Sequence, residues 1–137
     1  MPKKLYSISI NHSPDKLFDL VADIESYPEF LPWVNAARIL ERTDDFIIAE
    51  LMIKYSMFRS KYTSKVTFVS KKEIIVELVD GPFKYLHNHW KFEDGKVSFM
   101  LDFELKSKLL ESMITKEFDH YNNKMMDAFL KRAEEVL

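Results

Sequence analysis

Residues 58–68 read FRSKYTSKVTF, a run in which apolar or small side chains alternate with charged and polar ones. Tyr62 and Val66 fall on one face of an extended chain, and Lys61 and Lys65 fall on the other. A strand shows this period of two when one face packs on a core and the other meets water, which is typical of antiparallel sheets. The run therefore predicts an antiparallel strand with a basic outer face.

The same alternation continues on both sides of this run and predicts a meander of further strands. Apolar residues recur at every second position in 47–55, 74–78 and 97–105, and a first strand is expected at 4–10. Polar or glycine-containing turns separate the runs, at 43–45, 70–72, 80–82 and 93–96. We expect a sheet of six to seven strands.

Helical spacing appears only near the two ends of the chain. Ser13 and Pro14 form a helix start, and the apolar spacing that follows predicts a helix over 14–25. From Lys108 onward, apolar residues recur every three or four positions without Pro or Gly, which predicts one long C-terminal helix. The order of elements implies a single α+β domain over residues 1–137, in which a curved antiparallel sheet wraps around the long helix.

A stiff apolar connection, SYPEFLPW at residues 26–33, follows the first helix. Each proline fixes its own φ and disfavours helical geometry in the residue before it, so we expect a bent segment with at most one helical turn. Its large side chains suit either a plug that closes the core or the rim of a cavity. The almost wholly apolar inner face of the sheet favours the rim.

The composition excludes several classes of function. With 20 basic and 22 acidic residues, the net charge of -2 gives no general attraction to phosphate backbones, so we expect no DNA partner. The absence of cysteine excludes disulfides and thiolate catalysis, and two glycines do not suffice for a phosphate-binding loop. No apolar run is long enough to span a membrane and no signal peptide is evident. We expect a cytoplasmic protein, with peripheral contact at the inner membrane as the alternative.

Groups able to do chemistry are few among the predicted inward positions. His87 and His89 alternate along one strand but lack an evident third ligand, so we expect no metal site. The inward positions are nearly all apolar, which predicts a protein without a catalytic set and therefore not an enzyme. Tyr62 and Tyr121 could hydrogen-bond a quinone or ketone oxygen, or they could satisfy one another.

Two adjoining blocks, residues 17–24 and 27–33, resemble the coenzyme Q-binding START-like proteins, a branch of the polyketide cyclase/dehydrase and lipid transport superfamily. Further similar blocks follow in the expected order within 49–51, 58–64, 78–83, 86–92, 97–103 and 128–133, so the resemblance covers nearly the whole chain. It implies a helix-grip fold, in which the sheet grips the C-terminal helix around a lipid-sized cavity. A typical member often has Cys where this chain has Val34.

The resemblance also implies a function. We expect a non-catalytic binding protein or chaperone for a polyprenyl quinone (coenzyme Q, ubiquinone) or a similar lipid, supporting respiration or quinone synthesis, with no cofactor beyond that bound lipid. The alternative is the ribosome-association toxin branch, which prevents ribosomal subunits from associating and for which the basic outer face with Arg59, Lys61 and Lys65 would be the contact. A polyketide cyclase or dehydratase ranks last.

The expected partners are thus a hydrophobic small molecule, a membrane in transient peripheral contact, and the ribosome in the alternative reading. We assign Tyr62, Tyr121 and Trp90 to the head-group end of the ligand, and the connection to the mouth that meets the membrane. The residues predicted to bind the ligand are Phe30, Leu31, Trp33, Leu51, Ile53, Tyr62, Val66, Leu78, Trp90, Phe99, Leu101, Phe103, Phe118, Tyr121 and Met125.

Overall fold

The computed structural model describes residues 3–9, 12–55, 58–115 and 118–136. In chain order its elements are β1 (Lys3–Ser9), α1 (Pro14–Ala22), the 3-10 helix η1 (Ile24–Glu29), β2 (Val34–Arg42), β3 (Phe46–Tyr55), β4 (Phe58–Val69), β5 (Glu73–Asp80), β6 (Phe83–Glu93), β7 (Lys96–Leu105), α2 (Lys108–Thr115) and α3 (Phe118–Val136). This order is the one that the sequence predicts, apart from the divided C-terminal helix.

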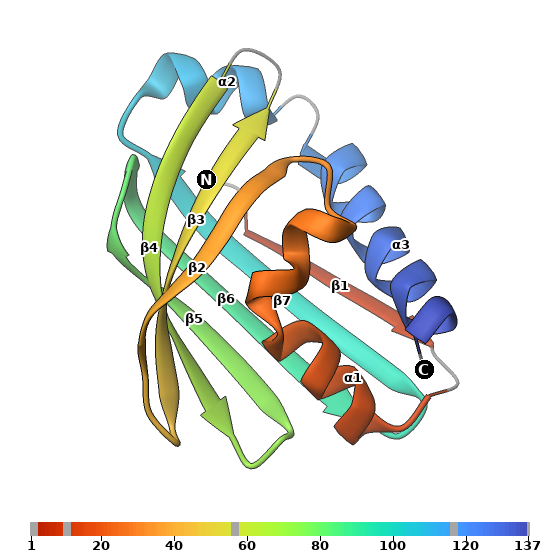
Figure 1. The fold of residues 1–137 in the computed structure, drawn as a ribbon. Helices are drawn as coiled ribbons and strands as arrows, with labels where there is room; N and C mark the ends of the chain where they lie inside the picture. The colour runs from red at the N-terminus through yellow and green to blue at the C-terminus, as the bar shows by residue number, and fades with distance from the viewer. Residues whose placement is uncertain (1–2, 10–11, 56–57, 116–117, 137) are drawn as a thin grey trace.

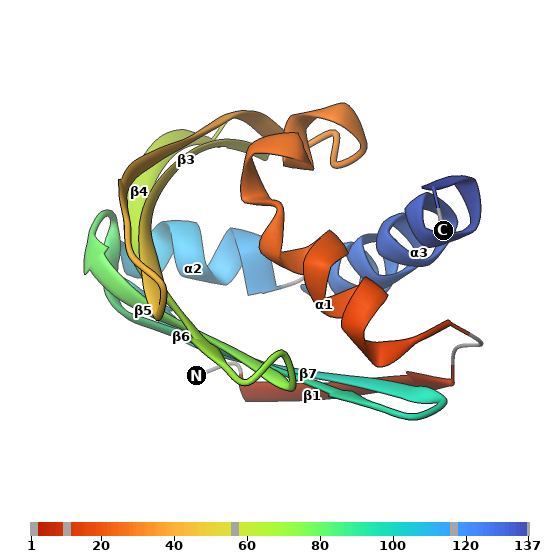
Figure 2. The same ribbon diagram turned by 60° about the horizontal axis from the view of Figure 1, so that its bottom comes forward.

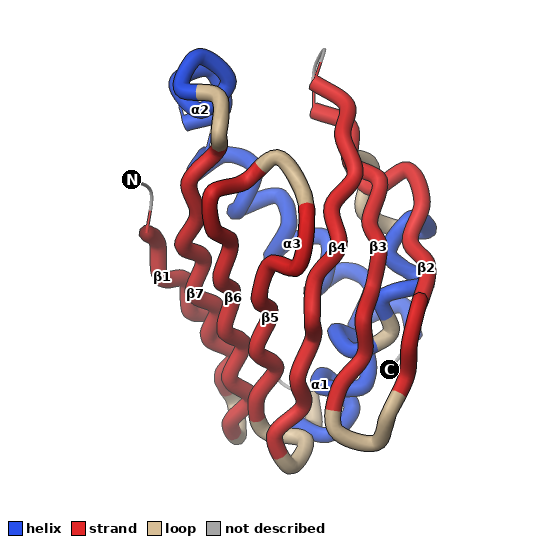
Figure 3. Tube along the Cα trace, turned by 90° about the vertical axis from the view of Figure 1, so that its left-hand side faces the viewer, coloured by secondary structure: helices blue, strands red, loops and turns tan. Residues whose placement is uncertain are grey.

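The strands form one antiparallel sheet in the order β1-β7-β6-β5-β4-β3-β2. Figure 3 shows the strands side by side, and Figure 2 shows the sheet curling so that α1 and α3 lie on its concave side. The predicted α+β helix-grip architecture, with six to seven strands, is therefore confirmed. Because the sheet curls, its inward side chains converge instead of meeting a flat layer of helices.

The alternation in β4 sorts side chains as predicted. Ser64 and Val66 are buried on the concave face, and Lys61 and Lys65 are exposed on the convex face. Val66 lies opposite Val76 of β5, so the inward face stays in step from strand to strand. The period of two along the sequence thus becomes a continuous apolar surface on one side of the sheet.

Helix α1 packs on the lower part of this concave face (Figure 1). Its apolar stripe buries Leu17, Phe18 and Val21, and the Phe18 ring meets those of Phe68 and Phe92 edge to face at 5.6 and 5.7 Å between centroids. The space between α1 and the sheet is therefore filled by side chains of the main hydrophobic core.

Helix α1 ends three residues before the predicted position. The backbone N–H of Asp23 still donates to the carbonyl of Asp19, but the chain then tightens into η1, which contains Pro28. A proline lacks the N–H that an α-helix needs in its interior, so the tighter turn replaces the predicted end of the helix. The sequence predicts at most one helical turn in the connection; η1, with six residues, is longer than one 3-10 turn and runs into the connection as far as Glu29.

The single long C-terminal helix was a wrong prediction. Two helices, α2 and α3, run in different directions (Figure 1). The Glu111 carboxylate accepts a hydrogen bond of 2.9 Å from the backbone N–H of Leu105, which fixes α2 beside the end of β7. Helix α3 instead buries Met126, Phe129 and Ala133 in the main core. One straight helix could not make both sets of contacts, although the apolar spacing alone permits it.

None of the helices in the described part of the chain is both long and apolar enough to cross a membrane.

Candidate ligand cavity

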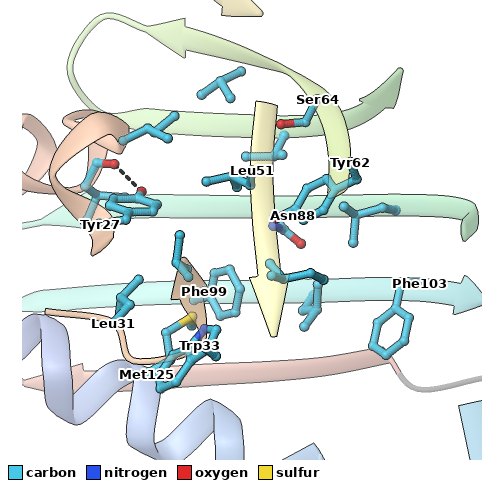
Figure 4. Close-up of a pocket in the computed structure, with 18 of the residues that line it drawn as sticks. Tyr27, Leu31, Trp33, Leu51, Tyr62, Ser64, Asn88, Phe99, Phe103 and Met125 are labelled. Carbon is cyan, nitrogen blue, oxygen red and sulfur yellow. Dashed lines mark hydrogen bonds between the residues drawn. The ribbon is translucent and has the colours of Figure 1, made fainter. Parts of the chain in front are cut away.

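A cavity of about 260 Å³ lies between the concave face of the sheet and the layer formed by η1, the connection after it and α3 (Figure 4). Strands β2 to β7 and the helices α1, η1 and α3 contribute its walls, and most of the inward positions are Leu, Ile, Val, Phe or Met. The residues that line it are Val21, Ile24, Tyr27, Leu31, Trp33, Val34, Leu51, Ile53, Lys54, Tyr62, Ser64, Val66, Ile74, Val76, Phe83, Leu86, Asn88, Trp90, Phe99, Leu101, Phe103, Leu105, Met125 and Phe129.

Most residues predicted to bind a ligand lie together on these walls: Leu31, Trp33, Leu51, Ile53, Tyr62, Val66, Trp90, Phe99, Leu101, Phe103 and Met125. Leu78 does not line the cavity and packs instead against a second apolar cluster with Phe83 and Phe103. The side chains of Phe118 and Tyr121 lie outside the described residues. Ligand contact by any of these residues stays a prediction.

The connection at residues 26–33 both lines the cavity and packs into the hydrophobic core. Leu31 is 3% exposed and lines the cavity, and its assignment to the mouth that meets a membrane stays a prediction. Trp33 also lines the cavity, and its carbonyl accepts a 2.8 Å hydrogen bond from the backbone N–H of Lys54 in β3. Phe30 is not among the lining residues and packs edge to face on Phe129 of α3, with 5.1 Å between ring centroids. The segment therefore fits both roles expected for it, because some of its side chains fill the core and others border the cavity.

Two tyrosines place hydroxyl groups at the cavity. The Tyr27 hydroxyl donates to the carbonyl of Val21, which ties the 3-10 helix to α1 (Figure 4). Burial, then the nearby Tyr62 hydroxyl and Asp23 carboxylate, raise the pKa of Tyr27 above that of free tyrosine. Burial raises the pKa of Tyr62 to about 12. Both groups are neutral at ordinary pH and serve as hydrogen-bonding groups only.

Asn88 is a polar residue of the cavity that the sequence reasoning missed. It lines the cavity from β6, and its Oδ1 is buried without a hydrogen-bond partner in the described part of the chain. The signal was present, because Asn88 has the same strand parity as Leu86 and Trp90, which are both buried.

His87 and His89 lie on the convex face of the sheet, opposite to Asn88. The His89 ring nitrogen Nε2 is 2.6 Å from the Glu73 carboxylate on the neighbouring strand, a partner that explains its position without a metal. Within the described ranges, no three His, Cys, Asp or Glu side chains gather closely enough to hold a metal ion.

The cavity lining contains few polar side chains. Its polar members are Tyr27, Tyr62, Ser64 and Asn88, together with Lys54 of β3, whose side chain is exposed. Among the described lining residues none is a carboxylic acid or a histidine, the usual general acids and bases. The walls suit an apolar body with one hydrogen-bonding end.

Comparisons with known proteins place these features in a family. The sequence pattern of the polyketide cyclase/dehydrase and lipid transport family matches residues 10–130. A ribosome association toxin, RatA, of Rickettsia prowazekii is 39% identical over 92% of this chain and 92% of its own length. A mitochondrial coenzyme Q-binding protein, the COQ10 homolog B of Xenopus laevis, is 26% identical over 93% of this chain, which spans 56% of that protein.

The fold also matches an experimental structure. The solution structure of an 18 kDa protein from Caulobacter crescentus superposes with a TM-score of 0.82 at 32% identity, covering 99% of this chain and 98% of that one.

Proposed function

The chain belongs to the polyketide cyclase/dehydrase and lipid transport family, and we propose that it is a non-catalytic binding protein for a polyprenyl quinone or a similar apolar ligand. The observation that carries the proposal is the cavity of about 260 Å³ with its apolar walls. The coenzyme Q-binding relative supports the quinone class. The shortage of acids and bases among the described lining residues supports binding without catalysis.

The size of the cavity limits how a long ligand is held. Ligand pockets for drug-sized molecules measure about 300–1,000 Å³, so this one takes a ring and the first part of a tail. The rest of a polyprenyl tail must extend beyond it. Moving that tail out of a membrane gains little of the roughly 0.8 kcal/mol per CH₂ that is available against water. Contacts with the head group therefore decide the affinity for the ligand. The part of the tail outside the cavity can stay in the lipid during transient contact with a membrane.

Tryptophan fluorescence offers a direct binding test, because the chain has two tryptophans, Trp33 and Trp90, and both line the cavity. We expect a benzoquinone with a decyl chain to quench this fluorescence in a saturable manner. Val76 lines the cavity from β5, whereas Val79 on the same strand is 56% exposed. The Val76→Phe variant should fill the cavity and weaken binding at least about tenfold, whereas Val79→Phe should bind like the parent. Equal weakening by both variants, or no saturable quenching, would contradict the proposal.

Association with ribosomes is a second candidate function, favoured by the toxin relative and by the exposed basic residues of the β3–β4 hairpin. We define the basic surface as Lys54, Arg59, Lys61 and Lys65, which are all exposed. Lys54 lies directly opposite Arg59 in the ladder. The nearby Glu50 carboxylate is paired with Arg38 at 3.2 Å, so it does not neutralise this surface fully. A local excess of positive charge on a chain of net charge -2 suits contact with RNA phosphates.

Sedimentation with purified large ribosomal subunits tests this candidate. We expect binding at low salt that weakens steeply as salt rises, because each phosphate contact releases counterions. The double variant Arg59→Glu with Lys61→Glu should abolish it. The matched control, Lys91→Glu with Lys96→Glu, makes the same charge change on β6 and β7, away from the basic surface. No sedimentation at low salt, or equal loss in both double variants, would remove the candidate.

A further inference from the structure

Asn88 presents an unsatisfied acceptor inside an otherwise apolar wall. Its Oδ1 is buried without a hydrogen-bond partner in the part of the chain that the structure describes. Its neighbours across the ladder are Val76 of β5 and Leu101 of β7, both of which also line the cavity and neither of which offers a donor. A buried polar group left unpaired is costly, so such an acceptor is a feature that a bound molecule can satisfy.

Two other polar side chains of the sheet wall come from β4, which lies across β5 from β6, and Lys54 comes from β3. Ser64 is 1% exposed, and Tyr62 precedes it by two positions on the same face. Figure 4 shows Tyr62, Ser64 and Asn88 toward one side of the cavity, and Trp33 and Met125 toward the other. We call the side with Tyr62, Ser64 and Asn88 the polar end of the cavity, although the apolar Leu51 and Phe103 also line that side and the Tyr27 hydroxyl, on the far side, donates to the Val21 carbonyl.

We propose that this polar end selects ligands whose head group carries a hydroxyl, such as a phenol or a hydroquinone, over the same molecule without a donor. The inference rests on the proposed function and narrows its ligand class. A quinone or an ether has only acceptor oxygens and leaves Oδ1 of Asn88 unpaired. A ligand hydroxyl donates to Oδ1 and accepts in turn from the Tyr62 or Ser64 hydroxyl.

The orientation of the amide strengthens the choice of a hydroxyl. A carboxamide that rotates about χ2 exchanges its oxygen and nitrogen, which changes whether it needs a donor or an acceptor. A hydroxyl serves either end of the amide, whereas a quinone or ether oxygen serves only the nitrogen end. In the orientation that the structure has, the oxygen is the atom without a partner.

Matched probes test the inference by fluorescence titration of Trp33 and Trp90. The probes are para-octylphenol and its methyl ether, which share ring and tail and differ in the hydroxyl donor. The parent protein should bind the phenol about tenfold more tightly, the size expected for pairing one buried acceptor. The Asn88→Leu variant should bind both probes with similar affinity. His87→Leu, on the same strand but the outer face, should keep the tenfold preference.

The outcomes separate the inference from the function on which it rests. Equal binding of the two probes by the parent, or a preference that survives in Asn88→Leu, would overturn the inference and leave the apolar-ligand function standing. Saturable binding of neither probe would overturn both. Thermal unfolding gives an independent readout, since Asn88→Leu removes an unpaired polar group and should melt at the same temperature as the parent or higher. Asn88→Ala takes its place in the titration if the leucine variant does not fold.

Discussion

Gly81 lies against Tyr62 so closely that a Cβ at position 81 would stand 2.6 Å from the Tyr62 Cβ and 3.2 Å from its Cα. The turn between β5 and β6 therefore sets the position of a cavity residue on β4. The glycine is required here by close approach, because backbone atoms of β4 cannot move aside without disturbing the ladder.

Replacement of Gly81 should consequently damage both stability and ligand binding. We expect Gly81→Ala to lower the free energy of unfolding by about 1–3 kcal/mol, measured by urea denaturation. Gly95→Asn is the control, since nothing lies within 4 Å of a Cβ there and Asn tolerates its φ of +75°. It should cost less than about 1 kcal/mol. The proposed contact is wrong if the two variants unfold alike.

Stability should fall at high pH because Tyr62 keeps its proton in the folded state. Its pKa is raised from 10.0 to about 12, so folding favours the protonated form. This stabilisation is fully present below pH 10 and is lost as the pH rises from 10 to 12, at up to about 1.4 kcal/mol per pH unit. Tyr27, whose pKa is also raised, contributes in the same direction. In Tyr62→Phe the free energy of unfolding should fall less steeply over this range, and parallel curves would count against burial of the hydroxyl.

Leu31 should behave as a core residue. At 3% exposure, Leu31→Ala is expected to cost about 2–5 kcal/mol in the free energy of unfolding. Leu40→Ala provides the same chemical change at a site that is 47% exposed, and should cost less than about 1 kcal/mol. A small and equal effect at both positions would contradict the burial of Leu31 in the core.

Arg132 joins the 3-10 helix to α3. Its Nη2 is 3.0 Å from the Glu29 carboxylate, and its guanidinium lies 5.3 Å from the centroid of the Phe30 ring. Glu29 is 60% exposed, so we expect Glu29→Gln to cost less than about 1 kcal/mol in unfolding free energy. Arg132→Ala should cost more, about 1–2 kcal/mol, because it also loses the contact with the ring. A double-mutant cycle that combines Arg132→Ala with Phe30→Leu measures the contribution of the contact between the guanidinium and the ring. A coupling energy near zero would refute that contribution.

Much of the fold could be predicted because its signals are local. The alternation in residues 58–68 and the spacing of Leu17, Phe18 and Val21 each report which face of one element is buried. The start of α1 follows from the fixed φ of Pro14 at its first position, whereas the side chain of the expected cap, Ser13, makes no capping hydrogen bond. The break between α2 and α3 could not be predicted in this way, because it depends on Glu111 meeting the end of β7 and on Phe129 meeting the core.

The candidate site also has features that the sequence determines and features that only the tertiary structure determines. By itself the sequence determined that Tyr62, Val66 and Trp90 face inward, because strand parity is a property of the chain alone. Only the tertiary structure decided which inward residues surround a cavity and which fill the core: Asn88 lines the empty space, whereas Leu78 packs against other side chains. The reason is that a cavity is what remains after the sheet has curled and the helices have packed, and that balance involves residues far apart in the chain.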